Sequence, residues 1–143
     1  MAGIYIHIPF CKQACHYCNF HFSTSRTLKN DFIAALLKET GLRADYLENE
    51  TVHTIYFGSG TPSLLSGAEL TVILENIHRH FPVGNDAEIT LEAKPDDVSL
   101  ESLNNWKSAG INRLSLGVLS FFPEDVRWMN RAHNEKQALD SIL

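Results

Sequence analysis

The sequence predicts an α/β protein with parallel strands, and three observations lead to this prediction. Short β-branched or aromatic runs alternate with amphipathic segments along the 143 residues. Gly, Pro and capping residues separate these segments. They form four strand–helix pairs, and such units place their strands in parallel with right-handed crossovers. A closed (β/α) barrel takes about 250 residues, so we expect part of an incomplete barrel; the alternative is an open sheet that stands alone.

The first pair joins a strand to a long helix. β-Branched and aromatic residues fill 3–8 before Pro9, which predicts a strand. Apolar residues then recur at i, i+4 spacing from Leu28, which predicts a helix over about 28–47. The segment between them, with its cysteines and a polar stretch, is expected to be a loop.

The second pair carries the clearest local signals. Residues 52–57 form a strand candidate, and the glycine-containing segment 58–62 follows it. Ser66 and Glu69 have the S-x-x-E spacing of a capping box, which predicts that a helix begins there. Its apolar stripe ends near 81–82.

The third pair is shorter. Residues 87–91 are expected to form a strand that ends at Glu92, and Pro95 interrupts the chain. A helix over about 100–109 follows, and Gly110 is placed to end it.

The fourth pair reaches the last residue. A strand is expected over 111–116, a loop over 117–122, and a helix with Pro123 in its first turn. A last helix begins near Asn134 and is expected to run to 143. Because four pairs make only part of a barrel, we interpret residues 1–143 as the N-terminal portion of a barrel domain whose remainder and C-terminal domain are absent.

Composition and charge exclude several classes of protein. With 44% hydrophobic and 20% charged residues the chain is unlike a disordered one. A net charge of −5 gives no footprint for nucleic acid. No apolar run approaches the roughly 20 residues of a membrane span, and the start lacks the features of a signal peptide. A cytoplasmic protein is therefore expected.

All three cysteines lie close together, directly after the first strand. Cys11, Cys15 and Cys18 have C-x3-C-x2-C spacing. Three thiolates can hold three irons of a [4Fe–4S] cluster and leave the fourth iron open. A structural zinc site with His16 or His21 as fourth ligand is the alternative, and metal-free cysteines are a third. Position favours the cluster, because active sites of parallel barrels lie at the carboxyl ends of strands.

Five stretches together resemble one known family. They are 5–11, 58–63, Glu92 with Pro95, 112–118 and 130–131. With Tyr17 as the aromatic residue before the third cysteine, the chain resembles radical S-adenosylmethionine (SAM) enzymes. More narrowly, it resembles the oxygen-independent coproporphyrinogen III oxidase family. The stretches follow that family's order and approximate spacing over nearly the whole chain.

The resemblance implies both cofactors and a reaction. SAM would chelate the open iron of the [4Fe–4S] cluster. Electron transfer would cleave SAM to methionine and a 5′-deoxyadenosyl radical, which abstracts hydrogen from the substrate. A flavodoxin or ferredoxin would supply the electron, and a porphyrin or heme would be substrate or cargo. Heme is a further cofactor that the resemblance allows in the full-length protein.

The resemblance also assigns eight cofactor-binding residues. Gly58, Ser59, Gly60 and Thr61 would approach the amino group of the methionine moiety, or else form an ordinary βα turn. Glu92 would accept from the ribose hydroxyls, or else cap a helix. Arg131 would bind the cofactor carboxylate, or else lie on the surface. Tyr5 and Tyr17 would lie near the cluster, although a strand tyrosine is more often part of a core.

Three residues depart from the family pattern in ways that bear on cofactor affinity. Ser59 stands where the middle of three glycines is usual. Leu119 stands where a glutamine usually contacts the cofactor. Lys94 stands where a neutral or acidic residue is usual. We expect these changes to affect the binding of SAM.

A fourth departure bears on the branch of the family. Phe20 stands where the genuine oxidases carry an additional cysteine. This indicates the heme-chaperone-like branch, so an oxidase and a heme chaperone without oxidase activity are both retained. The 143 residues alone are expected to be inactive, because an unfinished barrel leaves the radical site open to water. Trp106 and Trp128 are expected to serve packing.

Overall fold

The protein is an open four-stranded parallel sheet covered by helices. The computed structural model describes all 143 residues. The strands are β1 (Ala2–Ile8), β2 (Val52–Ser59), β3 (Val83–Ala93) and β4 (Arg113–Leu116), paired in chain order. The helices are α1 (Lys29–Leu42), α2 (Gly67–His80), α3 (Leu100–Ala109), α4 (Pro123–Trp128) and α5 (Glu135–Asp140), with 3-10 turns η1 (Pro62–Leu64) and η2 (Pro95–Asp97). The predicted fold class is confirmed.

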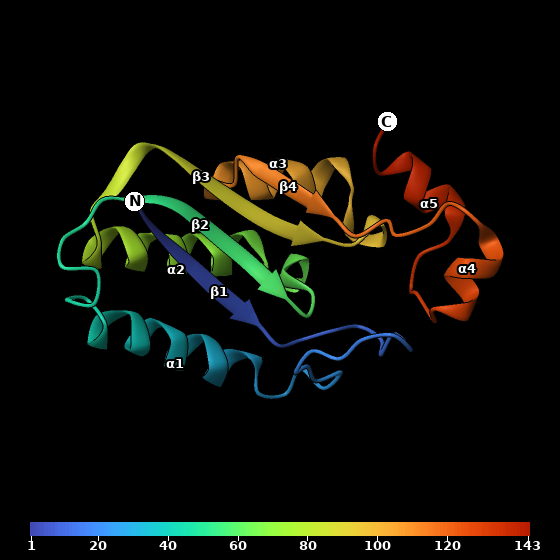
Figure 1. Cartoon of the computed structure of the whole chain (residues 1–143), viewed down its shortest axis with the longest axis horizontal. Coiled ribbons are helices and arrows are strands. Elements are labelled where there is room, and N and C mark those ends of the chain that lie inside the picture. Colours follow the sequence, from blue (N-terminus) through green and yellow to red (C-terminus); the bar gives the residue numbers. More distant parts are fainter.

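All strands point the same way, so their carboxyl ends meet at one edge of the sheet. Figure 1 shows the loop after β1 and the helices α4 and α5 together at this edge. We call it the carboxyl edge. The parallel register places Tyr5 beside Tyr56, Tyr56 beside Thr90, and Thr90 beside Arg113. Residues two positions further along each strand therefore reach the carboxyl edge together.

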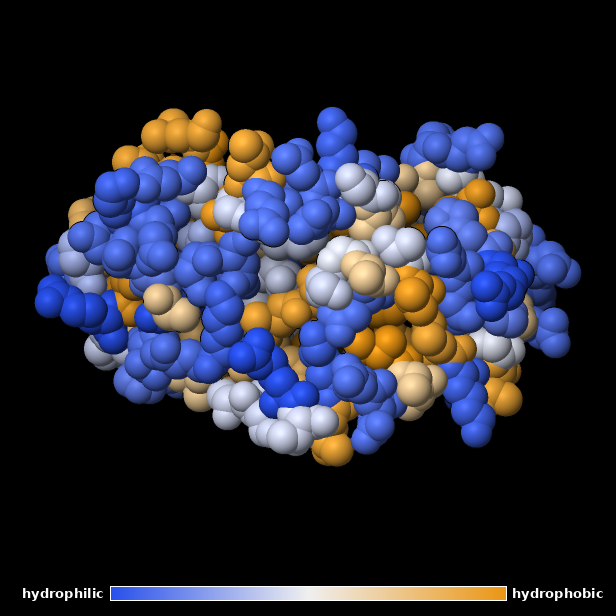
Figure 2. All heavy atoms as spheres, turned by 180° about the vertical axis from the view of Figure 1, so that it is seen from behind, coloured by the Kyte–Doolittle hydropathy of each residue, from blue (hydrophilic) through white to orange (hydrophobic).

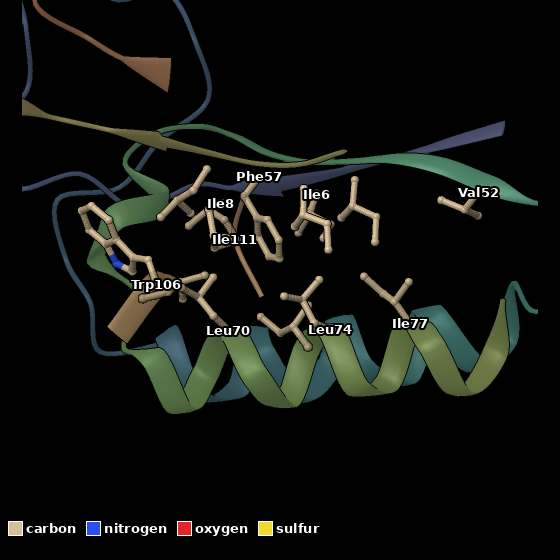
Figure 3. Packing of buried hydrophobic residues seen from close by; sticks show 14 of the residues in the cluster. Ile6, Ile8, Val52, Phe57, Leu70, Leu74, Ile77, Trp106 and Ile111 are labelled. Carbon is tan, nitrogen blue, oxygen red and sulfur yellow. The ribbon is translucent and has the colours of Figure 1, made fainter. Parts of the chain in front are cut away.

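One face of the sheet packs against the helices, and this packing forms the core. Successive strand residues point to opposite faces, and the buried set includes Ile6, Ile55, Phe57 and Leu91. Figure 3 shows Ile6 and Phe57 of the sheet facing the apolar side of α2, which contributes Leu70 among others. Each fully buried aliphatic or aromatic side chain stabilises the fold by about 1.5–3 kcal/mol. The core therefore fixes which strand residues remain on the other face.

Side-chain caps set where the helices begin. Ser66 accepts from the backbone of Glu69, and the Glu69 carboxylate accepts from the backbone of Ser66. The predicted box is thus confirmed, and a second capping box forms between Asn134 and Gln137 at the start of α5. Gly110 ends α3 with a φ of 108°, in the left-handed region that glycine tolerates best.

Several predicted boundaries were wrong. Helix α1 ends at Leu42 instead of 47, because the chain turns after Gly41 and takes positive φ values at Glu48 and Asn49. Helix α5 ends at Asp140 instead of 143, where the backbone N–H of Ser141 closes the last turn.

The predicted strand boundaries also differ from the structure. Strands β2 and β3 are longer than predicted, and β4 begins at Arg113 instead of 111. The Asn112 side chain explains the late start of β4. Its amide donates to the carbonyl of Ala87 and accepts from the N–H of Ile89, so these side-chain hydrogen bonds replace the regular backbone ladder between β4 and β3 at this point.

The two tryptophans differ in their surroundings. Trp106 is buried in the core, as predicted. Trp128 is 71% exposed at the end of α4, so its predicted packing role was wrong. The helix is only six residues long, and the apolar side chain it buries is that of Val126.

The helices of the structure include no candidate for a membrane-spanning segment. None of them combines the length and the apolar character that a bilayer crossing requires. Figure 2 shows the side of the molecule that faces away in Figure 1, where hydrophilic side chains predominate and smaller hydrophobic areas lie between them.

Candidate functional site

The cysteine loop follows β1 and is anchored at the carboxyl edge. The backbone N–H of Cys11 donates to the carbonyl of Ser23 over 3.0 Å, and the N–H of Ser23 donates to the carbonyl of Pro9 over 2.7 Å. The N–H of Cys18 donates to the carbonyl of Cys15 over 3.1 Å. All three thiols are free; Cys11 is buried and the other two are half-buried. The loop therefore holds its sulfurs at the end of β1.

A segment more than 110 residues later in the chain holds the other side of the loop. The amide of Gln13 donates to the side chain of Asn130 over 2.6 Å, and Asn130 donates to the carbonyl of Ala14 over 2.8 Å. The imidazole Nδ1 of His16 lies 2.8 Å from the carbonyl oxygen of Trp128. Sequence patterns carry no signal for such contacts, and our sequence analysis missed Gln13 and Asn130.

A charged cluster ties the loop to η2. The ammonium of Lys12 donates to Asp96 over 2.9 Å and also contacts Asp97, which accepts from Ser63 over 2.6 Å. Burial by itself lowers the pKa of Lys12, but the hydrogen bonds to the two aspartates outweigh it and raise the pKa overall. The side chain between the first two cysteines is thus held as a cation against the end of β3.

A cavity of about 350 Å³ opens between the cysteine loop and the carboxyl edge. The predicted residues in its lining are Cys11, Cys15, Cys18, Tyr17, Ser59, Gly60, Thr61, Glu92 and Arg131. The other two predicted residues, Tyr5 and Gly58, lie on the paired strands β1 and β2 and do not line this cavity. An added Cβ at Gly58 would lie 2.7 Å from the ring of Tyr5. The strands and loops therefore bring most of the predicted site to one place.

Arg131 lines this cavity beside the cysteine loop. Its Nη1 donates to the hydroxyl of Tyr17 over 2.8 Å and lies 3.7 Å from Sγ of Cys15, while Nη2 contacts the carbonyl of Gly117. Its Nε is buried without a partner. Burial raises the pKa of Tyr17 against the opposing charge of Arg131. The guanidinium is thus fixed beside a cysteine while one of its donors stays free.

Glu92 is held by a residue that the sequence analysis missed. The hydroxyl of Tyr56 donates to Oε1 of Glu92 over 2.7 Å, and the ring of Tyr56 stacks on Tyr5 with centroids 6.1 Å apart. Burial and the bond to Glu92 raise the pKa of Tyr56. The period of two along β2 could have indicated Tyr56, since Ile55 and Phe57 on either side of it are core residues.

The glycine-containing segment is tight and strained. Ser59 has a φ of 80°, a conformation that favours glycine, and its hydroxyl lies 2.9 Å from Nε2 of His7. An added Cβ at Gly60 would lie 2.7 Å from the carbonyl oxygens of Ile8 and Phe10. Gly60 is therefore required by the loop after β1, and Ser59 occupies a backbone position better suited to glycine.

The donor set is present, but it is not gathered into a metal-binding arrangement. No three His, Cys, Asp or Glu side chains lie together as they would around a metal ion. The three sulfurs would have to converge by movement of their loop for a cluster to bind. The same holds for a zinc site that uses His16 or His21. Thiolates on one loop at the wall of a cavity nevertheless fit an iron–sulfur cluster by their chemistry.

Comparisons with known proteins agree on one family. Residues 5–143 match the family model described as Radical SAM superfamily. The heme chaperone HemW of Escherichia coli is 38% identical over 138 residues, which are 95% of this chain and 36% of that protein. HemW of Mycobacterium tuberculosis is 38% identical over 140 residues.

A solved structure shares the fold. It is that of coproporphyrinogen III oxidase (HemN) from Escherichia coli, described as a radical SAM enzyme. It matches with a TM-score of 0.85 and 30% identity, over 98% of this chain and 33% of that one. The sheet and helices thus correspond to part of the barrel in that structure. The chain spans about a third of the length of these relatives.

Proposed function

The chain belongs to the radical SAM superfamily, and from this membership we propose that it binds a [4Fe–4S] cluster and SAM. Cys11, Cys15 and Cys18 would hold three irons, and SAM would chelate the fourth. When bound and reduced, these cofactors supply a radical that abstracts hydrogen from a substrate. The observation that carries the proposal is the convergence of the cysteine loop, Glu92 and Arg131 on one cavity.

The residues around the cavity would each have a defined task. The free Nε of Arg131 is a donor available to a carboxylate, next to Cys15. Glu92, oriented by Tyr56, keeps acceptor capacity for ribose hydroxyls. Thr61 donates to Sγ of Cys11 over 3.5 Å, which fixes the position of that sulfur. These assignments come from the family pattern, and the geometry around each residue is compatible with them.

We propose further that these residues are the N-terminal portion of a barrel domain. The share of the relatives that the chain spans supports this. The remaining strands would exclude water from the cavity, so the 143 residues alone should show no turnover. An electron donor such as flavodoxin or ferredoxin would bind the complete protein in the cytoplasm.

The cargo or substrate of the complete protein would be a heme or porphyrin. Relatives of two kinds match, one named heme chaperone and one named coproporphyrinogen III oxidase. Phe20 lines the cavity where the family's oxidases carry a further cysteine. We therefore favour a heme chaperone over an oxidase. Incubation of the complete protein with coproporphyrinogen, followed by detection of decarboxylated product, decides between them: turnover would overturn the chaperone assignment.

Metal and sulfide analysis after anaerobic reconstitution tests the cluster. We expect about four irons per chain in the native protein and loss of iron and sulfide in Cys15→Ala. His16→Ala and His21→Ala are the matched controls, because neither is a ligand in our proposal. One zinc without sulfide, lost in either histidine variant, would instead establish the structural zinc site. Unchanged iron and sulfide in Cys15→Ala would also refute the cluster assignment.

A further inference from the structure

Lys94 is the only buried lysine in the chain, and its ammonium has no partner. It follows β3 directly and is 6% exposed. Lys12 and Lys29 are more exposed, yet each forms an ion pair with a carboxylate. The ammonium of Lys94 forms neither an ion pair nor a hydrogen bond. The ammonium itself is not fully buried, so it reaches solvent as a cation that is available to an anionic ligand.

Arg131, the other cation in the lining of the same cavity, has an unsatisfied donor. Four buried side-chain atoms lack a partner: Nε of Arg131, the two ring nitrogens of His133 and the carboxylate oxygen Oδ1 of Asp96. Buried polar atoms in proteins are nearly always hydrogen-bonded, so the free Nε of Arg131 points to a ligand in this cavity. Burial, and then the charges of Arg131 and Lys94, lower the pKa of the neighbouring His133, while the charge of Asp96 and a hydrogen bond with the backbone of Val118 oppose the shift.

The cavity restricts what this ligand can be. Lys94 and Arg131 line the same cavity, and Glu92 is the only carboxylate in its lining. That carboxylate already accepts from Tyr56. Leu119 also lines the cavity and offers no hydrogen bond. The carboxylate of the methionine moiety is the only negatively charged group of SAM, so it is the group that two cations beside the cysteines would attract.

We propose that Lys94 binds the carboxylate of SAM together with Arg131, so that this chain holds the cofactor by two cations. The inference rests on the proposed function, because it requires SAM in the cavity. It makes Lys94 a cofactor-binding residue, a role more definite than the effect on SAM binding that we expected from this departure in the sequence.

Binding of two ligands to the reconstituted complete protein tests this inference. In Lys94→Met the affinity for SAM should fall about tenfold or more, as expected for loss of one charge-assisted hydrogen bond. The affinity for decarboxylated SAM should change less than about twofold by the same reasoning. Lys94→Arg should restore most of the SAM affinity, and Lys38→Met on the exposed side of α1 is the matched control.

The outcomes separate this inference from the proposed function. Equal loss for both ligands, or no loss for either, in a protein that holds iron and binds SAM would overturn the role of Lys94 alone. A shifted reduction potential of the SAM-free cluster in Lys94→Met, with SAM affinity unchanged, would mean that Lys94 acts on the cluster instead. Failure of the native protein to bind iron or SAM would overturn the proposed function itself. Thermal unfolding of each variant confirms that it is folded.

Discussion

Where α1, α2 and α3 cover the sheet, the buried side chains are apolar or satisfied, whereas the carboxyl edge holds thiols, charges and unsatisfied donors. The contrast is clear for polar groups. Asn76, buried in α2, donates to the carbonyl of Leu37 over 3.1 Å. At the edge, the half-buried Arg131 and the buried His133 keep buried nitrogen atoms without partners. The two regions are therefore shaped by different requirements, packing in one and ligand binding in the other.

Backbone strain follows the same division. Five residues other than glycine have positive φ, and three of them, Ser59, Leu119 and Asn130, lie around the cysteine loop and its cavity. Strained conformations persist only where the surrounding structure enforces them, and they cluster at functional sites. The helix-covered part of the sheet, which we call the body, is therefore built for stability. It supports a carboxyl edge that is not optimised for stability.

Removal of a core side chain should have the largest effect on stability. Phe57 is 0% exposed, and Phe57→Ala should lower the free energy of unfolding by about 3–5 kcal/mol. Phe122, 64% exposed at the edge, is the matched control. Phe122→Ala should change the free energy of unfolding by less than about 0.5 kcal/mol. Urea unfolding measures both. Similar losses of unfolding free energy in the two variants would contradict the proposed difference between the core and the carboxyl edge.

A substitution at Gly60, where the backbone of the carboxyl edge is most tightly packed, should give the next largest loss of stability. In Gly60→Ala the new methyl group meets two backbone carbonyls, which should cost about 1–3 kcal/mol of stability. It should also lower the iron content after reconstitution, because the cysteine loop must shift. Gly41→Ala, near the end of α1, serves as control and should be neutral or stabilising. Undiminished stability in Gly60→Ala would contradict the close approach.

Relief of strain at the edge should stabilise the protein. Leu119 has a φ of 65°, so Leu119→Gly should raise the free energy of unfolding by about 0.5–1 kcal/mol. Phe121 lies in the same loop without a positive φ, and Phe121→Gly should instead be destabilising. The same unfolding assay compares them. A destabilised Leu119→Gly would show that its side chain contributes more than its backbone costs.

Glu69 in helix α2 should make the free energy of unfolding depend slightly on pH. Burial alone raises the pKa of Glu69, but the hydrogen bonds from Lys29 and Ser66 lower it below its ordinary value of 4.5. The stabilisation is therefore complete above pH 4.5 and is lost as the pH falls through the lowered pKa. We expect less than about 1 kcal/mol. Unfolding curves of the native protein and Glu69→Gln should converge at acidic pH; parallel curves would exclude this contribution.

The body could be predicted well because its signals are local. The period of two in the strands, the capping box at Ser66 and the glycine that ends α3 all lie within a few residues. Boundaries were less certain, as at α1, where no strong stop signal follows Gly41. Burial against a partner element decides such boundaries, and the sequence does not display it.

The edge could be predicted only in part. The cysteine spacing and the family resemblance identified most residues that line the cavity. They could not identify Tyr56 as the partner of Glu92, or Asn130 as the anchor of the loop. Such pairs are 36 and 116 residues apart, so only the folded sheet brings them together. The exposed Trp128 shows the reverse error, since an apolar residue at a helical position need not face a core.

The central claim is that the carboxyl edge holds a cluster with an open iron that SAM occupies. An EPR spectrum of the reduced, anaerobically reconstituted protein, recorded with and without SAM, tests it most directly. We predict the signal of a reduced [4Fe–4S] cluster that changes when SAM is added. A cluster signal that SAM leaves unchanged, or a protein that contains zinc and no iron, would contradict the claim.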